Sequence, residues 1–229
     1  MPIDSTLRDA LGAVTTASLA RALHRRGLGG MLAGVLPRAG AGVRIVGEAF
    51  TLRLIPERAD AAPGPSARIE AAVEVIPEGG VAIAAAGGCG AGAAVLGEIL
   101  AARLSKRGVA ALVTDGGVET VGALPVWAAA LAGPMGGALT LAGSAVPIAL
   151  GGAAVHPGDI VVADADGVVV IPPGIAEAVA LEAVERQRLD LWILREIERG
   201  AGLSGLSPPS PETLARYEAE TATPRSGQD

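Results

Sequence analysis

The sequence contains very little cysteine and few aromatic residues. Its single cysteine, Cys89, excludes an intramolecular disulfide and is typical of a protein in a reducing compartment. Aromatic residues make up 2% of the chain and are limited to Phe50, Trp127, Trp192 and Tyr217. Single-stranded nucleic acids are bound by stacking bases on aromatic rings, and this chain offers no such platform. The core must therefore consist of alanine, valine, leucine and isoleucine, with glycine between them.

Excess positive charge and long uninterrupted apolar runs are also missing. The formal net charge is −6 and the sequence pI is about 5.0, which argues against a general nucleic-acid binder. The apolar tracts are broken by 33 glycines and 16 prolines, too often for membrane spans. No basic segment followed by an apolar one begins the chain, so no signal peptide is expected. We expect a cytoplasmic protein without nucleic-acid or membrane partners.

The chain is long enough to bury a substantial core. It has 229 residues, of which 50% are hydrophobic. Neither an internal repeat nor a long linker divides it. Residues 1–229 are therefore predicted to form a single α/β domain, with residues 207–229 as an extended C-terminal tail whose end is disordered.

The stretch from residue 96 to residue 125 predicts a helix, a buried strand and a glycine turn in succession. A helix is expected to begin at Gly97 and Glu98 and to stop at Gly108, and residues 109–113 read as a strand buried on both faces. A glycine turn containing Asp115 is expected to follow this strand. Ligand sites of α/β sheets lie at the carboxyl ends of the strands. Glu98, Asp115 and Glu119 are therefore expected to border a site.

The patterns in the rest of the sequence predict further helices and strands. Thr15 or Thr16 caps a helix over residues 17–26, and residues 28–42 read as a loop. Further helices are expected over residues 68–75, 175–199 and 211–219. Strands are expected over residues 43–55, with a bulge at Gly47, over residues 81–86 and within residues 139–150. Residues 155–172 are expected to form a hairpin that turns at Asp166-Gly167.

Several polar residues leave two interpretations open. Arg53, inside a predicted strand, either points to solvent or contacts an anion. Asp159 and Asp164 are either turn-forming aspartates or metal ligands, with turns the commoner outcome. The glycine cluster at residues 87–92 lacks the GK[ST] of a P-loop, and Cys89 within it is interpreted as a packed side chain because no histidine is near in sequence.

Five segments together resemble the RraA-like family, which includes class II pyruvate aldolases acting on 4-hydroxy-4-methyl-2-oxoglutarate. Many of its members are labelled demethylmenaquinone methyltransferases. The segments are VTTASLARALHRRGL, VGEAFTLRLIP, LGEILAARLSKRG with VAALVTDGG, VHPGDIVVADADGVVVIP and GLSPPSPETL. The resemblance implies an αββα sandwich that assembles as a homo-trimer or hexamer, with small-molecule sites in clefts between subunits.

The resemblance also implies specific site residues. In the aldolases a loop reads D-G-x-x-R-D, in which the arginine binds the pyruvate carboxylate and the last aspartate holds Mg²⁺ or Mn²⁺. An acidic residue after the helix-start glycine positions a metal-bound water, and the helix-start amides bind substrate oxygens. The positions that match these motifs are Gly97, Glu98, Ile99 and Leu100 at the helix start, and Asp115 and Gly116 at the loop.

Two positions depart from that pattern. Glu119 stands where the arginine is expected, and Thr120 stands where the metal-binding aspartate is expected. The first change replaces a carboxylate clamp, worth roughly 1.5–3 kcal/mol, by a like charge. The second replaces an anionic metal ligand by a neutral hydroxyl, so the family's metal position is expected to be lost.

Three hypotheses follow for the function. In the first, the site has been repurposed for lyase-like chemistry on a neutral or cationic molecule, with Glu98, Glu119 and Asp115 as catalytic candidates. In the second, the protein is a non-catalytic oligomer that binds or regulates, as RraA proteins regulate a ribonuclease. In the third, weak aldolase or oxaloacetate decarboxylase activity survives with Mg²⁺ or Mn²⁺, and Arg53 or a neighbouring subunit supplies the cation. A vestigial site, with Glu119 a solvent-exposed acid and Thr120 a cap, is the alternative to all three.

Overall fold

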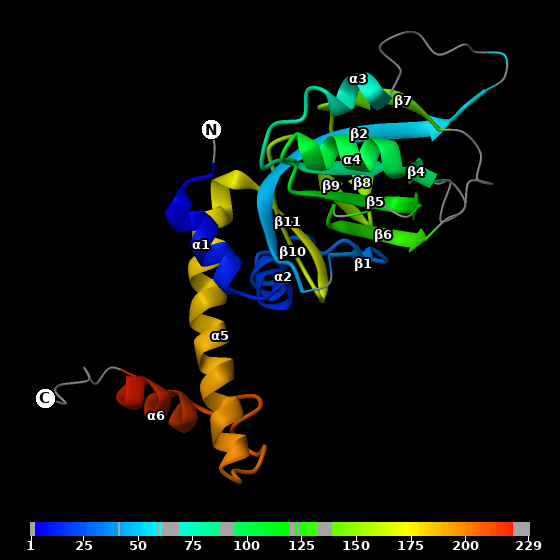
Figure 1. Ribbon diagram of the computed structural model, residues 1–229. Helices are drawn as coiled ribbons and strands as arrows, with labels where there is room; N and C mark the ends of the chain where they lie inside the picture. Colours follow the sequence, from blue (N-terminus) through cyan, green and yellow to red (C-terminus); the bar gives the residue numbers. More distant parts are fainter. Residues whose placement is uncertain are drawn as a thin grey trace, which may run out of the picture. The chain divides into compact units, whose positions relative to one another are not determined.

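The computed structural model describes residues 3–40, 42–58, 60, 69–87, 94–119, 122, 124–131 and 139–221. The chain divides into two compact units, Met1–Ala183 and Val184–Asp229. The first unit is a mixed α/β structure built on one large sheet (Figure 1). The prediction of an α/β fold is therefore confirmed.

Nine strands of the described residues form the large sheet. Its path is β1 (Leu36–Ala39), β6 (Val126–Leu131), β5 (Ala111–Val118), β3 (Val81–Ala85), β2 (Ile45–Pro56), β10 (Ile160–Asp164) and β11 (Gly167–Ile171), while β4 (Ala94–Leu96) pairs with β5 and β7 (Leu139–Ser144) pairs with β2. Strands β2, β3, β5 and β6 are parallel to one another. The two edge strands of the path, β1 and β11, also contact each other, so the sheet is nearly closed.

Both faces of the parallel strands are buried. Helices α3 (Ile69–Val73) and α4 (Glu98–Lys106) pack on one face, where Val73 and Leu104 join a single apolar cluster with Leu112 (Figure 1). On the other face a second cluster contains Trp127 and residues of the small sheet formed by β8 (Ile148–Leu150) and β9 (Ala153–Val155). This double burial explains why β3 reads as a continuous apolar run.

The N-terminal helices pack beside the β2–β10–β11 end of the sheet. Helix α1 (Ser5–Ala13) contacts β2, and α2 (Thr16–Arg25) contacts β10 and β11. Thr15 caps α2 by accepting a hydrogen bond from the Ser18 amide, and Gly27 follows the helix with a φ of 72°. The predicted cap and stop signal are thus confirmed.

Three local predictions were wrong. Residues 28–42, predicted as a loop, contain β1, which the surrounding glycines and prolines concealed. Gly47 is not a bulge but pairs in register with Val161; a Cβ there would lie 2.6 Å from the Gly79 carbonyl oxygen, so close packing requires the glycine. The hairpin turns at Ala165-Asp166 rather than Asp166-Gly167, because Gly167 already pairs with Asp164.

The second unit is a small helical structure. It contains most of α5 (Ala176–Glu198), which begins in the first unit after a short 3₁₀ turn at Pro173–Ile175, and α6 (Pro211–Thr221). Trp192 meets Tyr217 edge-on with ring centroids 5.7 Å apart, and these rings pack with neighbouring aliphatic side chains in a separate apolar cluster.

Asp159 and Asp164 both act in turns. The Asp159 carboxylate accepts a hydrogen bond from the His156 amide at 2.8 Å, before β10. The Asp164 carboxylate accepts from the Asp166 amide at 2.9 Å in the hairpin. Among the described residues no group of three histidine, cysteine, aspartate or glutamate side chains is placed to hold a metal ion. The turn-forming interpretation accounts for both aspartates.

The buried carboxyl of Asp159 leads to a testable pH dependence. Burial raises its pKa above the ordinary value, and the His156 amide and the charge of His156 oppose this only in part. The folded state therefore holds this proton more tightly than the unfolded chain, so the contribution of Asp159 to stability falls as pH rises from about 4 through its folded-state pKa. Asp159→Asn does not titrate and should gain stability relative to wild type as pH rises through this window.

Urea unfolding at several pH values between about 4 and 7 measures this difference. The same pair of proteins in a His156→Gln background removes the imidazole from the comparison. A stability difference that does not change with pH would contradict the prediction.

Candidate functional site

The N-terminus of α4 is the first part of the candidate site. Gly97 is its N-cap and supplies no side-chain hydrogen bond to the free amides of the first turn. Glu98 is exposed, and the Ile99 side chain is 86% exposed, whereas Leu100 packs partly against the core. The helix therefore begins with open amides and an apolar side chain in solvent.

The second part is an irregularity in β5. Thr114 pairs with Ala128 and Gly117 pairs with Ala130, so β5 carries one extra residue relative to β6. Thr114 Oγ1 donates to the Ala84 carbonyl at 2.7 Å and accepts from the Gly116 amide at 3.0 Å. Asp115 and Gly116 thus lie in a bulge within the strand. The predicted glycine turn after a short strand was wrong, because β5 continues to Val118.

Asp115 has a structural contact at this bulge. Its Oδ1 accepts a hydrogen bond from the Ala86 amide at 2.6 Å. This bond ties the end of β3 to β5 and occupies part of a half-buried carboxylate. Any catalytic use of Asp115 must accommodate this hydrogen bond.

Glu119 lies directly against the start of α4. Pairing of Leu96 with Val118 brings β4 beside the end of β5, and the Glu119 amide donates to the Leu96 carbonyl at 3.3 Å. A Cβ built on Gly97 would lie 3.0 Å from Glu119 Oε2. The Glu119 carboxylate therefore lies at the positive end of the helix macrodipole, where a bound anion would otherwise be stabilised.

Arg53 lies at the same carboxyl edge but on another strand. It pairs with Ala85 of β3, and the β3–β5 register brings Asp115 level with Ala85. Arg53 and Asp115 are thus about 10 Å apart, two strand spacings. The Arg53 side chain is exposed, and its Nη2 approaches the Ala142 carbonyl at 3.5 Å.

The structure brings some of the predicted residues together and leaves others apart. Gly97, Glu98 and Glu119 meet at the start of α4, and Asp115 and Arg53 lie along the same sheet edge. Thr120, Cys89 and the rest of the glycine cluster after Gly87 lie outside the described residues. Sequence reasoning missed Thr114, whose hydroxyl holds the bulge; its position next to Asp115-Gly116 was the available signal.

Comparison with known proteins identifies the family of this chain. A family model described as RraA-like: Aldolase/RraA matches residues 6–170, more than half of the chain. The chain belongs to the RraA-like family. The predicted fold resemblance is confirmed by this match.

Solved structures share the RraA-like fold along most of the chain. An uncharacterized protein from Pseudomonas syringae pv. tomato str. DC3000 is 25% identical with a TM-score of 0.78, covering 92% of this chain and 96% of its own. Streptomyces coelicolor RraAS2, an unusual member of the RNase ES inhibitor RraA protein family, is 28% identical with a TM-score of 0.74, covering 84% and 98%. A Geobacillus kaustophilus HTA426 protein named as S-adenosylmethionine: 2-dimethylmenaquinone methyltransferase is 25% identical with a TM-score of 0.55, covering 69% and 94%.

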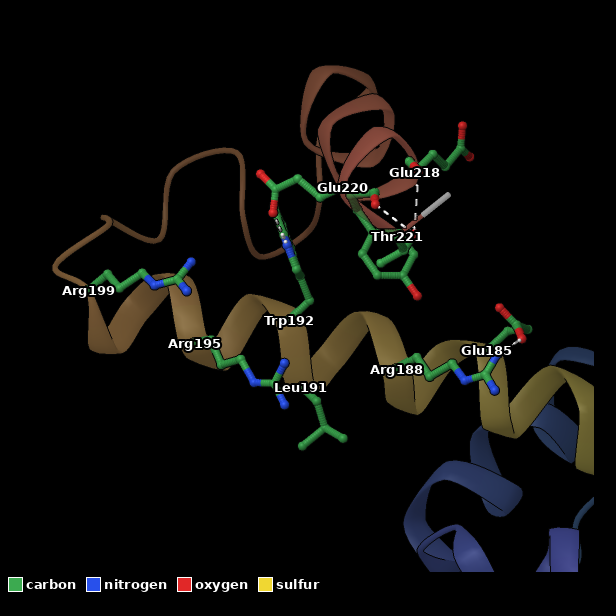
Figure 2. Close-up of a pocket in the computed structure, with 10 residues that line it drawn as sticks. Glu185, Arg188, Leu191, Trp192, Arg195, Arg199, Glu218, Glu220 and Thr221 are labelled. Carbon is green, nitrogen blue, oxygen red and sulfur yellow. Dashed lines mark hydrogen bonds and ion pairs between the residues drawn. The ribbon is translucent and has the colours of Figure 1, made fainter. Parts of the chain in front are cut away.

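A cavity of about 960 Å³ lies in the second unit, beyond the residues matched by the RraA-like model. Figure 2 shows its wall along α5, where Arg188, Arg195 and Leu191 project, and its opposite wall at the end of α6. Trp192 Nε1 donates to the Glu220 carboxylate at 2.8 Å, which links the two helices. Within the described residues no helix is long and apolar enough to cross a membrane.

Proposed function

We propose that this RraA-like protein binds a neutral or cationic small molecule at the start of α4 and performs lyase-like chemistry on it. A pyruvate-type acid is disfavoured as the ligand. The observation that carries the proposal is the Glu119 carboxylate lying 3.0 Å from a Cβ position on Gly97. An anionic substrate would have to displace this carboxylate or bind beside it.

The electrostatic cost for an anion is large. Two like charges about 4 Å apart repel by roughly 4 kcal/mol at the effective dielectric of a protein surface. The dipole of a helix N-terminus returns at most about 2 kcal/mol to an anion. The repulsion exceeds the attraction, so a neutral or positively charged group is the better occupant beside Glu119.

Glu98 and Glu119 are the groups proposed for acid–base work. They follow the two paired strands: Glu98 comes two residues after Leu96 of β4, and Glu119 comes directly after Val118 of β5. Glu98 is exposed, whereas Glu119 is half-buried. Two carboxyl groups that border one site can serve as general acid and general base. Gly97, Ile99, Leu100, Gly116 and Arg53 are proposed as ligand contacts.

Mg²⁺ or Mn²⁺ does not fit the described residues of this site. The described part of the chain contains no group of three metal-binding side chains, and the Asp115 carboxylate already accepts from the Ala86 amide. The sequence also places the neutral hydroxyl of Thr120 where the family's metal-binding aspartate is expected. The proposed chemistry is therefore written with the carboxylates of this chain and has no step through a metal.

A homo-oligomer is proposed because apolar side chains are exposed at this edge. Ile99 is 86% exposed and Leu131, which pairs with Val118, is 68% exposed. Large apolar groups in solvent beside a polar site are typical of an interface. A trimer or hexamer would cover them and enclose the site between subunits.

Two other functions each have one supporting observation. Similarity to Streptomyces coelicolor RraAS2, of the RNase ES inhibitor RraA protein family, supports a non-catalytic regulatory oligomer. The position of Arg53 level with Asp115 supports a weak aldolase or oxaloacetate decarboxylase in which Arg53 replaces the missing cation.

An assay of pyruvate release separates these functions. The wild-type chain is expected to release no pyruvate above background from a 4-hydroxy-2-oxo acid or from oxaloacetate, with Mg²⁺ or Mn²⁺ present. Robust turnover would contradict the proposal, and loss of that turnover in Arg53→Gln would establish the weak-aldolase function. Recovery of a ribonuclease in a pull-down, with its activity inhibited, would establish the regulatory function instead.

A further inference from the structure

A second cavity lies at the opposite end of the sheet from Glu119. It occupies about 530 Å³ between α1 and the start of β2 and is lined by Arg8, Asp9, Arg44 and Ala110 among others. Arg44 immediately precedes β2, and Ala110 immediately precedes β5. Since β2 and β5 run parallel to β3, these residues lie at the amino edge, away from the candidate site at the carboxyl edge.

Main-chain carbonyls hold both guanidiniums at this cavity. Arg8 Nη1 donates to the Val46 carbonyl at 2.6 Å, and Arg44 Nη1 donates to the Gly12 carbonyl at 2.7 Å. A carbonyl oxygen orients a guanidinium without neutralising its charge. Because each guanidinium has five N–H donors, most of them stay available for a ligand.

The two guanidiniums at this cavity differ in their charge partners. Within the described residues Arg8 makes no ion pair, whereas Arg44 Nη2 forms a hydrogen-bonded ion pair with the Asp164 carboxylate at 3.4 Å. That carboxylate already accepts hydrogen bonds from Thr16 and Asp166. Asp9 is the acidic residue among those that line the cavity, whose other walls are small or apolar.

We propose that this cavity binds a small oxyanion, either a phosphate or a carboxylate group, between Arg8 and Arg44. Planar guanidiniums bind both groups through paired, charge-assisted hydrogen bonds. Two arginines from separate elements, each fixed by the main chain, provide a preorganised site for a single oxyanion.

Isothermal titration calorimetry of the full chain with inorganic phosphate and with malonate tests the proposal, at an ionic strength of about 0.15 M. At least one anion is expected to bind saturably. Arg8→Gln should weaken that binding about tenfold, the loss of one charge-assisted contact. Arg44→Lys keeps the charge but loses the paired geometry and should weaken binding as well. The anion that binds more tightly identifies the ligand group.

Arg58→Gln is the matched control, because Arg58 is exposed and paired with Asp60 elsewhere on the surface. It should leave the affinity unchanged. Absence of saturable binding by either anion would overturn the proposal. So would equal binding by wild type and a folded Arg8→Gln variant. Neither result bears on the function proposed for the α4 start.

Discussion

Replacing Asp164 by alanine should lower the free energy of unfolding by about 3 kcal/mol. Asp164 is 6% exposed, and its carboxylate accepts from the Thr16 amide at 2.9 Å and from the Thr16 hydroxyl at 2.6 Å. It also accepts from the Asp166 amide at 2.9 Å. Alanine would leave these donors without an acceptor, and each buried unsatisfied donor costs about 1–3 kcal/mol. Urea unfolding followed by circular dichroism measures the loss.

The same turn offers a matched control. Asp166 is exposed, and its contribution to the hairpin is a main-chain amide that alanine retains. Asp166→Ala should therefore change stability by less than about 1 kcal/mol. Equal effects of the two substitutions would mean that the hairpin turn, rather than the link from Asp164 to α2, carries the stabilisation.

Asp164 also shows where sequence reasoning reached its limit in the fold. A turn-forming aspartate was predictable, because it lies between two β-rich runs next to Asp166 and Gly167. Its bonds to Thr16 connect residues 148 positions apart. Trp127 Nε1, which donates to the Asp164 carbonyl at 2.8 Å, comes from yet another strand. Local patterns fix helices and hairpins, whereas such contacts depend on the sheet order.

The candidate site likewise contains a part that was predictable from the sequence and a part that was not. The start of α4 at Gly97 and Glu98 was predictable from the sequence, because apolar residues recur at helical spacing between these residues and the stop signal at Gly108. The length of β5 did not, because Asp115-Gly116-Gly117 resembles a turn and glycine is rare inside strands. The decisive juxtaposition of Gly97 with Glu119 arises from the pairing of β4 with β5, and a strand of three residues leaves little periodicity to read.

Glu119→Gln should tighten the binding of oxalate by at least about tenfold. Oxalate is a small dianion similar in shape to the enolate of pyruvate, and it should bind at the free amides of the α4 N-terminus. In the wild-type chain the Glu119 carboxylate occupies that region, 3.0 Å from a Cβ position on Gly97. Glutamine keeps the size and removes the charge. Tenfold corresponds to about 1.4 kcal/mol, well below the roughly 4 kcal/mol of like-charge repulsion at close range.

Isothermal titration calorimetry of both chains with oxalate measures the change, and Glu70→Gln provides the control. Glu70 is an exposed acid in the first turn of α3, so its replacement alters the net charge by the same amount and leaves the residues of α4 unchanged. Glu70→Gln should leave oxalate affinity within about twofold of wild type, since the effect of an exposed charge is weakened by solvent and salt. Equal gains in oxalate affinity in the two variants would mean that the effect comes from net charge alone. An unchanged affinity in Glu119→Gln would mean that its carboxylate does not oppose anions at the α4 start, and the preference for a neutral or cationic ligand would fail with it.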